Sequence, residues 1–209
     1  MTIKRCFLFV LMCSYLAVST AQISPEVFER YQCDEIEPSE PELRLELLEM
    51  ERVDQEAAQA LVALGSDEMP PLFIEQASRL EQSLESFDWL GIDLVGCDGA
   101  NAAFLIAQHA DENVPFQEIA LKRLTSAVKR DQAMSWQLAY LTDRVLINTG
   151  KKQIYGTQHE MINDKLVPRP LEYPAKVDEL RAEMDLGTLE DYLEISQDYL
   201  EGSGSLSDR

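Results

Sequence analysis

The sequence reads GANAAFLIAQHA over residues 99–110 and is apolar on every side through its central AAFLIA. A helix whose whole circumference is apolar has to be buried, so this run predicts a helix that other elements enclose. The glycine-punctuated residues 88–98 before it predict a connection, and Asp98 is a suitable N-cap for the helix. We therefore expect a compact domain built around residues 99–110.

Further helices are predicted on both sides of this run. In the longer segments apolar residues recur every three or four positions, which is the spacing of one buried helix face. Thr188 and Asp191 resemble a capping box at the start of the last helix. The predicted helices cover residues 26–32, 42–64, 72–87, 115–129, 132–148, 176–184 and 188–200. The expected fold is mainly α, a compact multi-helix domain.

One segment has a different pattern. Apolar residues flank the turn-forming pair Asn163-Asp164, which predicts one small β-hairpin near residues 152–168. We find no fixed repeat period along the chain, although helices of this size at close spacing are also typical of helical-repeat folds. The hairpin is the only sheet that we expect.

The first 21 residues have the three parts of a secretory signal. A basic pair comes first and an apolar run to Val18 follows. Small residues then precede a predicted cleavage site after Ala21. The apolar run is shorter than the roughly 20 residues that a membrane anchor needs. A lipoprotein cut before Cys13 is disfavoured because the residue before it, methionine, is large. We expect a cleaved signal peptide at 1–21 and an exported, soluble protein, periplasmic or extracellular.

The rest of the chain divides into three parts by composition. Residues 22–41 form an acidic, proline-containing extension, residues 42–200 a single helical domain, and residues 201–209 a tail that we expect to be disordered. The whole chain has 209 residues, which suits one domain.

The charge of the chain excludes two classes of partner. Lys and Arg number 18 and Asp and Glu 38, so the formal net charge is −20. A phosphate backbone and an anionic membrane surface both require cationic protein surfaces. We therefore expect no nucleic acid and no membrane as partner after signal cleavage, and a small polar ligand or a protein instead.

Two cysteines, Cys33 and Cys97, remain in the chain after cleavage of the predicted signal peptide. In an oxidising compartment a lone pair is more often a disulfide than a metal or redox site. The alternative is a nucleophilic thiol. We expect a Cys33–Cys97 disulfide that ties the extension to the domain.

Several catalytic and cofactor motifs are absent. The chain has no GxxxxGK[ST], GxGxxG or GxSxG, and with two histidines, His109 and His159, it has no HExxH helix. No cysteine and histidine spacing fits structural zinc, and no aspartates fit a calcium loop. We expect neither a metal nor a cofactor, and the sequence leaves open whether the protein is an enzyme.

A few polar residues occupy apolar positions. Asp54 continues the apolar stripe of the helix at 42–64, and His109 closes the all-round apolar helix. Asp143 and Arg144 lie in a helix with two apolar faces. Buried charges are costly unless they are paired or hydrogen-bonded.

Two interpretations of these residues are open. In the structural one, buried Asp and Arg pair with each other and His109 is a satisfied core residue. In the functional one, His109, Asp111, Asp143 and Arg144 surround one cleft, with His109 as general acid or base and Arg144 holding an anion. A metal on His109 and Asp111 is disfavoured, because residues two apart on a helix point in different directions.

Four motifs resemble an uncharacterised bacterial family, domain of unknown function 6624. They are LLEMERVDQ (47–55), AAFLIAQHAD (102–111), AYLTDRV (139–145) and QIYGTQ (153–158). The resemblance covers about residues 43–195 and implies a mostly helical domain that ends with the Tyr-Gly-Thr-Gln turn, but no established activity. Its polar motif positions are Asp54, Gln55, Gln108, His109, Asp111, Gln117, Asp143, Arg144, Gln153, Tyr155, Thr157 and Gln158.

This chain departs from the family pattern by its signal segment, its acidic extension and extra helical sequence near residues 66–87. We expect an exported domain that binds a polar ligand, peptide or sugar. One alternative is a hydrolase or transferase that uses His109, Asp111 and Asp143 for catalysis. The other is a structural interaction module with a buried polar network. Apart from these three catalytic candidates, the polar motif positions named above are the expected ligand-binding residues.

Overall fold

The structure is a computed structural model and describes residues 25–31, 33–64, 70–163 and 165–204. Within these residues the chain is mainly α-helical, with one two-stranded antiparallel hairpin, as the sequence predicts. The predicted signal peptide, residues 1–21, lies outside the described residues. In the part of the chain that is described, no helix combines the length and the apolar character that crossing a bilayer requires.

The helices begin and end close to the predicted positions. Prolines start both α3 and α4, where a missing N–H costs nothing. The elements in chain order are α2 (Pro25–Arg30), η2 (Cys33–Glu35), α3 (Pro41–Leu64), α4 (Pro71–Ser86), α5 (Ile92–Gln108), α6 (Val114–Val128), α7 (Ser135–Asn148), β1 (His159–Ile162), β2 (Lys165–Pro168), η3 (Pro174–Lys176), α8 (Val177–Ala182) and α9 (Leu189–Gly204).

The last helix confirms its predicted cap and corrects its predicted end. The Thr188 hydroxyl accepts a hydrogen bond from the backbone N–H of Asp191 at 3.2 Å and donates to the Asp191 carboxylate at 2.6 Å. Helix α9 continues to Gly204, beyond the predicted end near Leu200. Residues 201–204, predicted to be disordered, are therefore helical, and the rest of the predicted tail lies outside the described residues.

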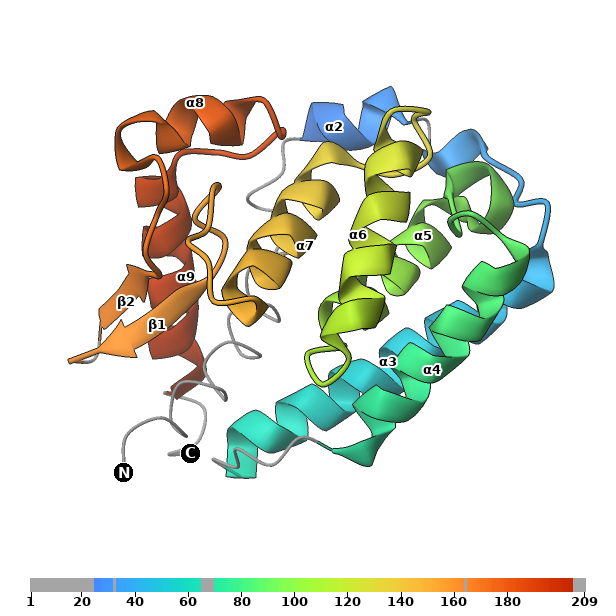
Figure 1. Cartoon of the computed structure of the whole chain (residues 1–209), viewed down its shortest axis with the longest axis horizontal. Helices are drawn as coiled ribbons and strands as arrows, with labels where there is room; N and C mark the ends of the chain where they lie inside the picture. The colour runs from blue at the N-terminus through green and yellow to red at the C-terminus, as the bar shows by residue number, and fades with distance from the viewer. Residues whose placement is uncertain (1–24, 32, 65–69, 164, 205–209) are drawn as a thin grey trace.

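Helix α5 is the centre of the core. It packs against α3, α4, α6 and α7. Figure 1 shows α3 and α4 on one side of the domain and α9 with the hairpin on the other, with α5, α6 and α7 between them. The buried side chains of its apolar run are Ala102, Ala103, Phe104, Leu105, Ile106 and Ala107. The all-round apolar pattern thus marks the enclosed helix, as predicted.

The start of α5 differs from the prediction. The helix begins at Ile92 and not at residue 99, with Gly91 at its N-cap. Gly96 has φ 73, a left-handed conformation that a residue with a side chain rarely adopts, and the helix kinks there. Asp98 is therefore inside the helix. Its carboxylate still accepts from the N–H of Gly99 at 2.8 Å, just after the kink.

The hairpin is shorter than predicted. Strands β1 and β2 pair antiparallel, with Met161 opposite Leu166. Asn163 lies in the turn with φ 52. The hairpin lies within the predicted region near residues 152–168, but its first strand begins at His159, because residues 153–158 form a loop that bonds to helix α7.

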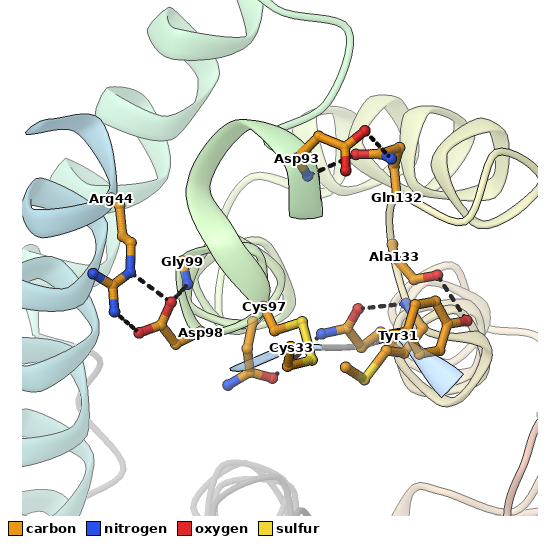
Figure 2. Close-up of a disulfide and its surroundings, with 12 residues drawn as sticks. Tyr31, Cys33, Arg44, Asp93, Cys97, Asp98, Gly99, Gln132 and Ala133 are labelled. Carbon is orange, nitrogen blue, oxygen red and sulfur yellow. Dashed lines mark hydrogen bonds and ion pairs between the residues drawn. A yellow bond between two sulfur atoms is a disulfide. The ribbon is translucent and has the colours of Figure 1, made fainter. Parts of the chain in front are cut away.

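The predicted disulfide is confirmed. Cys33 and Cys97 are bonded with a Cα–Cα distance of 5.6 Å, and Figure 2 shows the bond beside the start of α5. The extension also packs on the domain: Val27 is buried, and the Tyr31 hydroxyl donates to the carbonyl of Ala133 at 3.3 Å. The acidic extension is thus attached to the helical domain by both covalent and packing contacts.

Candidate functional site

A histidine–aspartate pair joins the end of α5 to α3. The Nδ1 atom of His109 lies 2.6 Å from Oδ2 of Asp54, and each side chain is 1% exposed. Phe73 of α4 packs edge-on against the imidazole with ring centroids 5.8 Å apart. An ionised carboxylate can only accept, so Nδ1–H of His109 donates this hydrogen bond to Asp54, and in a neutral imidazole the lone pair is then on Nε2. Asp54 therefore fixes both the orientation and the tautomer of His109.

Two polar atoms of this pair, Nε2 of His109 and Oδ1 of Asp54, lack hydrogen-bond partners, and so do both amide atoms of Gln108, the residue before His109. All four atoms are buried. Most buried polar atoms in proteins have a partner, and a missing one costs about 1–3 kcal/mol. We call Asp54, Gln108 and His109 the dyad site. Its free donors and acceptors are groups that a ligand could satisfy.

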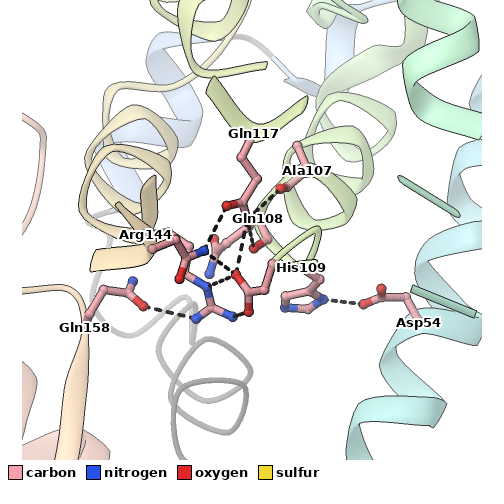
Figure 3. A network of polar contacts seen from close by, with 9 residues as sticks. Asp54, Ala107, Gln108, His109, Gln117, Arg144 and Gln158 are labelled. Atoms are coloured by element: carbon pink, nitrogen blue, oxygen red, sulfur yellow. Dashed lines mark hydrogen bonds and ion pairs between the residues drawn. The ribbon is translucent and has the colours of Figure 1, made fainter. Parts of the chain in front are cut away.

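A buried ion pair lies next to the dyad site. Arg144 of α7 donates from Nε and Nη2 to the two carboxylate oxygens of Asp111, at 2.8 and 2.6 Å. These side chains are 0% and 1% exposed. The Nη1 atom of Arg144 donates to Oε1 of Gln158 at 3.0 Å (Figure 3). The guanidinium is therefore held by its own protein partners.

Two amides complete the surroundings of Asp111. Asn148 donates to Oδ1 of Asp111 at 2.7 Å and to Oε1 of Gln117 at 2.9 Å, while Gln117 donates to the carbonyl of Gln108 at 3.0 Å. Burial acts to raise the pKa of Asp111, but the Arg144 guanidinium and the Asn148 amide outweigh it and hold that pKa below its usual range. Asp111 is thus a stably ionised structural carboxylate.

Asp143 organises the loop that precedes the hairpin. Its carboxylate accepts from the backbone N–H groups of Ile154 at 2.7 Å, Thr157 at 2.9 Å and Tyr155 at 3.1 Å. Burial raises the pKa of Asp143, and these hydrogen bonds only partly offset it. The turn passes through Gly156 at φ 70, where an added Cβ would also lie 2.9 Å from a leucine side chain. Asp143 therefore shapes a turn that requires glycine.

The two glutamines of the same loop close it. Gln153 donates to the carbonyls of Gln158 and Arg169, both at 2.8 Å, and accepts from the N–H of Gln158 at 2.8 Å. Gln158 then reaches Arg144 with its side chain. The loop of the Tyr-Gly-Thr-Gln motif is thereby connected to the buried ion pair.

Except for Gln55, the predicted site residues fall into three groups, and hydrogen bonds connect the middle group to each of the other two. The dyad site lies at α3 and α5, the ion pair with Gln117 and Gln158 lies beside it, and the loop around Asp143 lies further along. Asp143 and Arg144 do not bond to each other, so the expected pairing of these two neighbours is wrong: Arg144 reaches Asp111 and Gln158. Tyr155 contributes its backbone N–H to Asp143. Gln55 is half-buried and takes no part in this network among the described residues.

Sequence reasoning misses three members of the site. Asn148 bonds to Asp111, and its position one helical turn after Arg144 is a signal that could have found it. Asn101 donates to Glu51 at 3.3 Å and accepts from Gln137 at 3.3 Å, which links α3, α5 and α7. Glu51 lies among many surface acids of α3, so its burial has no sequence signal.

A second buried histidine lies apart from the dyad site. His159 of β1 is 0% exposed and packs against Tyr192 with ring centroids 4.6 Å apart. The Arg181 guanidinium lies over the Tyr192 ring, 4.9 Å from its centroid. Burial, helped by the Arg181 charge, lowers the pKa of His159 to about 3. His159 is therefore a neutral core residue at ordinary pH.

This lowered pKa predicts an acid-sensitive contribution to stability. Between pH 6.5 and about 3 the unfolded chain binds a proton on His159 that the folded chain does not, so the free energy of unfolding falls as the pH falls. From pH 7 to pH 5 we expect a loss of about 2 kcal/mol from this residue. The substitution His159→Phe should remove that part of the loss. Urea unfolding of both proteins at pH 7 and pH 5 measures it, and an undiminished loss in the variant would contradict it.

The donor set of the site is poor in metal ligands. In the described ranges no three His, Cys, Asp or Glu side chains form a group that could hold a metal ion. The free atoms of the dyad site are one imidazole nitrogen, one carboxylate oxygen and one amide. Such a set suits hydrogen bonding to an organic ligand.

Comparison with known protein families gives a match. A family of unknown function (DUF6624) matches residues 41–202, which confirms the resemblance seen in the four motifs. No curated protein and no solved structure matches the chain. The dyad site, the buried ion pair and the loop around Asp143 all lie inside the matched region.

Proposed function

We propose that this chain, which belongs to DUF6624, a family of unknown function, binds a small polar ligand at the dyad site. The ligand would offer hydroxyl, amide or amine groups of the kind that peptides and sugars carry. One observation supports this above all: four buried polar atoms of Asp54, Gln108 and His109 have no partner within the protein.

The contrast between two buried glutamines supports the same proposal. Gln108 and Gln117 are both 0% exposed. Gln117 uses both its amide atoms within the protein, whereas Gln108 uses neither. A side chain that only stabilises the fold should resemble Gln117, because an unmade hydrogen bond is a cost that a Leu or Met would avoid.

Replacing these two glutamines separates a binding role from a structural one. We expect Gln108→Leu to raise the free energy of unfolding by about 1 kcal/mol, because it removes an unsatisfied buried amide. Gln117→Leu should lower it by about 2 kcal/mol, because Asn148 and the Gln108 carbonyl lose their partner. Denaturant unfolding followed by circular dichroism measures both. If Gln108→Leu destabilises as much as Gln117→Leu, Gln108 is structural and the proposed function fails.

The same variant identifies ligands. A thermal-shift screen of the mature protein against metabolites and muropeptides should give compounds that stabilise the wild type and not Gln108→Leu. Binding to the folded state raises its free energy of unfolding by RT ln(1 + L/Kd), where L is the free ligand concentration. A compound that acts equally on both proteins binds elsewhere.

A second candidate function is acid–base catalysis by His109. The observation in its favour is the 2.6 Å contact of Nδ1 with Asp54, which leaves Nε2 available for proton transfer. Asp111 and Asp143 are engaged with Arg144 and with backbone N–H groups, so they are positioning residues in this scheme. In the ligand screen, a hit that is converted to product by the wild type and bound but not converted by His109→Gln would favour the enzyme.

We infer further that the chain is exported, with residues 1–21 removed. The three-part pattern of that segment supports this, and the Cys33–Cys97 disulfide is compatible with an oxidising compartment. The intact mass of the exported chain, recovered outside the cytoplasm, tests it. A chain retained in the cytoplasm at full length would refute it.

A further inference from the structure

A second buried arginine differs from Arg144 in its charge balance. Arg181 of α8 is 1% exposed, and Arg144 is 0% exposed. The charge of Arg144 is matched by Asp111, whereas no carboxylate of the described residues forms an ion pair with Arg181. A buried charge without a partner of opposite sign is costly. The guanidinium of Arg181 therefore lacks the counter-charge that Arg144 has.

The Arg181 guanidinium lies in the wall of a cavity. The cavity has a volume of about 290 Å³, and Arg181, Gly187, Tyr192 and Ile195 are among the residues that line it. Nε of Arg181 donates to the carbonyl of Gly187 at 2.6 Å, and its guanidinium carbon lies 4.9 Å from the centroid of the Tyr192 ring. Because both contacts are with lining residues, the charged end of the side chain is at the cavity.

Part of the hydrogen-bonding capacity of this guanidinium is unused. A guanidinium has five N–H groups. Within the described part of the chain, Arg181 uses one on Nε, to Gly187, and one on Nη1, to the carbonyl of Tyr155 at 2.9 Å. Nη2 is not among the enclosed polar atoms that lack a partner, so it reaches accessible space. The remaining N–H groups, both of those on Nη2 included, are therefore available to a molecule in the cavity.

Two carboxylates act on Arg181 through space only. Asp178 accepts from the backbone N–H of Leu189 at 2.8 Å, and Asp143 accepts from the N–H groups of the loop at 153–158. Burial lowers the pKa of Arg181, and the nearby tyrosines and these two carboxylates offset this only in part. The positive charge is thus not cancelled at contact distance within the described residues.

Two acids at the cavity limit the charge of its ligand. Asp191 and Glu194 also line it. Asp191 accepts from the Thr188 hydroxyl at 2.6 Å, and Glu194 is exposed to water. A phosphate group carries nearly two negative charges at pH 7, so both acids would repel it more than a carboxylate, which carries one. A carboxylate also matches the planar guanidinium with two parallel hydrogen bonds.

We propose that Arg181 binds the carboxylate of a small organic acid in this cavity, where α8 meets α9. The carboxylate would accept from Nη2 and from the second N–H of Nη1, and Tyr192 and Ile195 would contact the apolar part of the acid. A volume of about 290 Å³ is at the lower end of the range for ligand pockets, which indicates a small ligand. The site does not depend on the proposed function, because α9 and α3 lie on opposite sides of the domain (Figure 1).

The test uses sodium acetate as the smallest probe of this class. It is titrated at pH 7 into the mature protein, with sodium chloride keeping the ionic strength constant, and acetamide and sodium phosphate are titrated for comparison. The readout is the NMR signal of the Arg181 Nε–H group, which is held by its bond to Gly187. We expect acetate to shift this signal saturably. Acetamide lacks the charge and chloride lacks two acceptor atoms in one plane, so neither should do so.

Three variants locate the binding. In Arg181→Lys the acetate Kd, read from the backbone N–H of Gly187, should rise about tenfold, because an ammonium group cannot form two parallel hydrogen bonds. Lys129→Gln removes one exposed positive charge just after α6 and should leave the Kd unchanged. Ile195→Trp keeps Arg181 and fills the cavity, so acetate should no longer shift the Nε–H signal. This third variant decides the matter even if Arg181→Lys does not fold.

Each other outcome overturns the inference. An equal shift with chloride, or a changed Kd in Lys129→Gln, means unspecific attraction of anions. A shift with acetamide means that charge is not recognised, and tighter binding of phosphate than of acetate means a phosphate site. An unchanged Kd in Arg181→Lys, or a persisting shift in Ile195→Trp, means that acetate binds elsewhere. No saturable shift means that Arg181 is structural. None of these outcomes affects the proposed function, which is decided by the Gln108 and Gln117 variants.

Discussion

Arg144→Met is expected to lower the free energy of unfolding by about 3–5 kcal/mol. The guanidinium donates two hydrogen bonds to Asp111, and both side chains are at most 1% exposed. Removing it leaves a buried carboxylate without its cation, and the cost of that isolated charge is the main part of the effect. Denaturant unfolding at pH 7, followed by circular dichroism, measures the loss.

An exposed ion pair of the same length provides the control. Arg79 and Glu46 are also 2.6 Å apart, but their side chains are 46% and 51% exposed. Arg79→Met should cost less than about 1 kcal/mol, because water screens the pair. In the double variant Asp111→Asn, Arg144→Met neither new side chain is charged, and the asparagine keeps an acceptor for Asn148. This variant should therefore recover at least half of the free energy of unfolding that Arg144→Met loses. An Arg144→Met loss no larger than that of Arg79→Met would show that burial does not strengthen this pair.

Breaking the disulfide should cost about 4 kcal/mol. The bond joins residues 64 positions apart, and closing a loop of that length in the unfolded chain removes entropy of this order. It also holds the extension, whose Val27 and Tyr31 pack on the domain. Unfolding of the mature protein with and without dithiothreitol measures the difference.

The variant Cys33→Ser, Cys97→Ser serves as the control for this experiment. It should unfold like the reduced wild type and should not respond to dithiothreitol. Alkylation of the unreduced, denatured wild type, read by intact mass, should modify no cysteine of the mature chain. Two modified thiols would show that the bond does not form.

The helices could be predicted because their signal is local. Apolar periodicity places α3, α4, α6 and α7 within a few residues, and the all-round apolar run marks α5 as the enclosed helix. Two of the differences from the prediction, the start of α5 and the start of the hairpin, have conformational or non-local causes. Gly96 lets α5 continue through a kink at positive φ, and a glycine in the sequence does not by itself indicate that a helix continues through it. The hairpin starts late because Asp143 of α7 takes the N–H groups that a longer strand would use.

The members of the site were easier to predict than their contacts. The apolar pattern identifies Asp54 and Asp143 as carboxylates at core positions, and both are buried. Their partners depend on packing between helices: Arg144 lies next to Asp143 in sequence but bonds to Asp111, 33 positions away. Glu51 could not be separated from the other acids of α3, because only the neighbouring helices determine which of them is covered.

The fastening of α5 at both ends has a kinetic consequence. Near its start Cys97 is bonded to Cys33, and Asp93 shares two hydrogen bonds with Gln132; just past its end, Asp111 is clamped by Arg144. A helix held in this way does not slide to meet a ligand, and the residues of the dyad site are at most 1% exposed, so the elements packed against α5 have to open for a ligand to enter. Association should then be slower than an ordinary protein–ligand rate, because binding requires this conformational change.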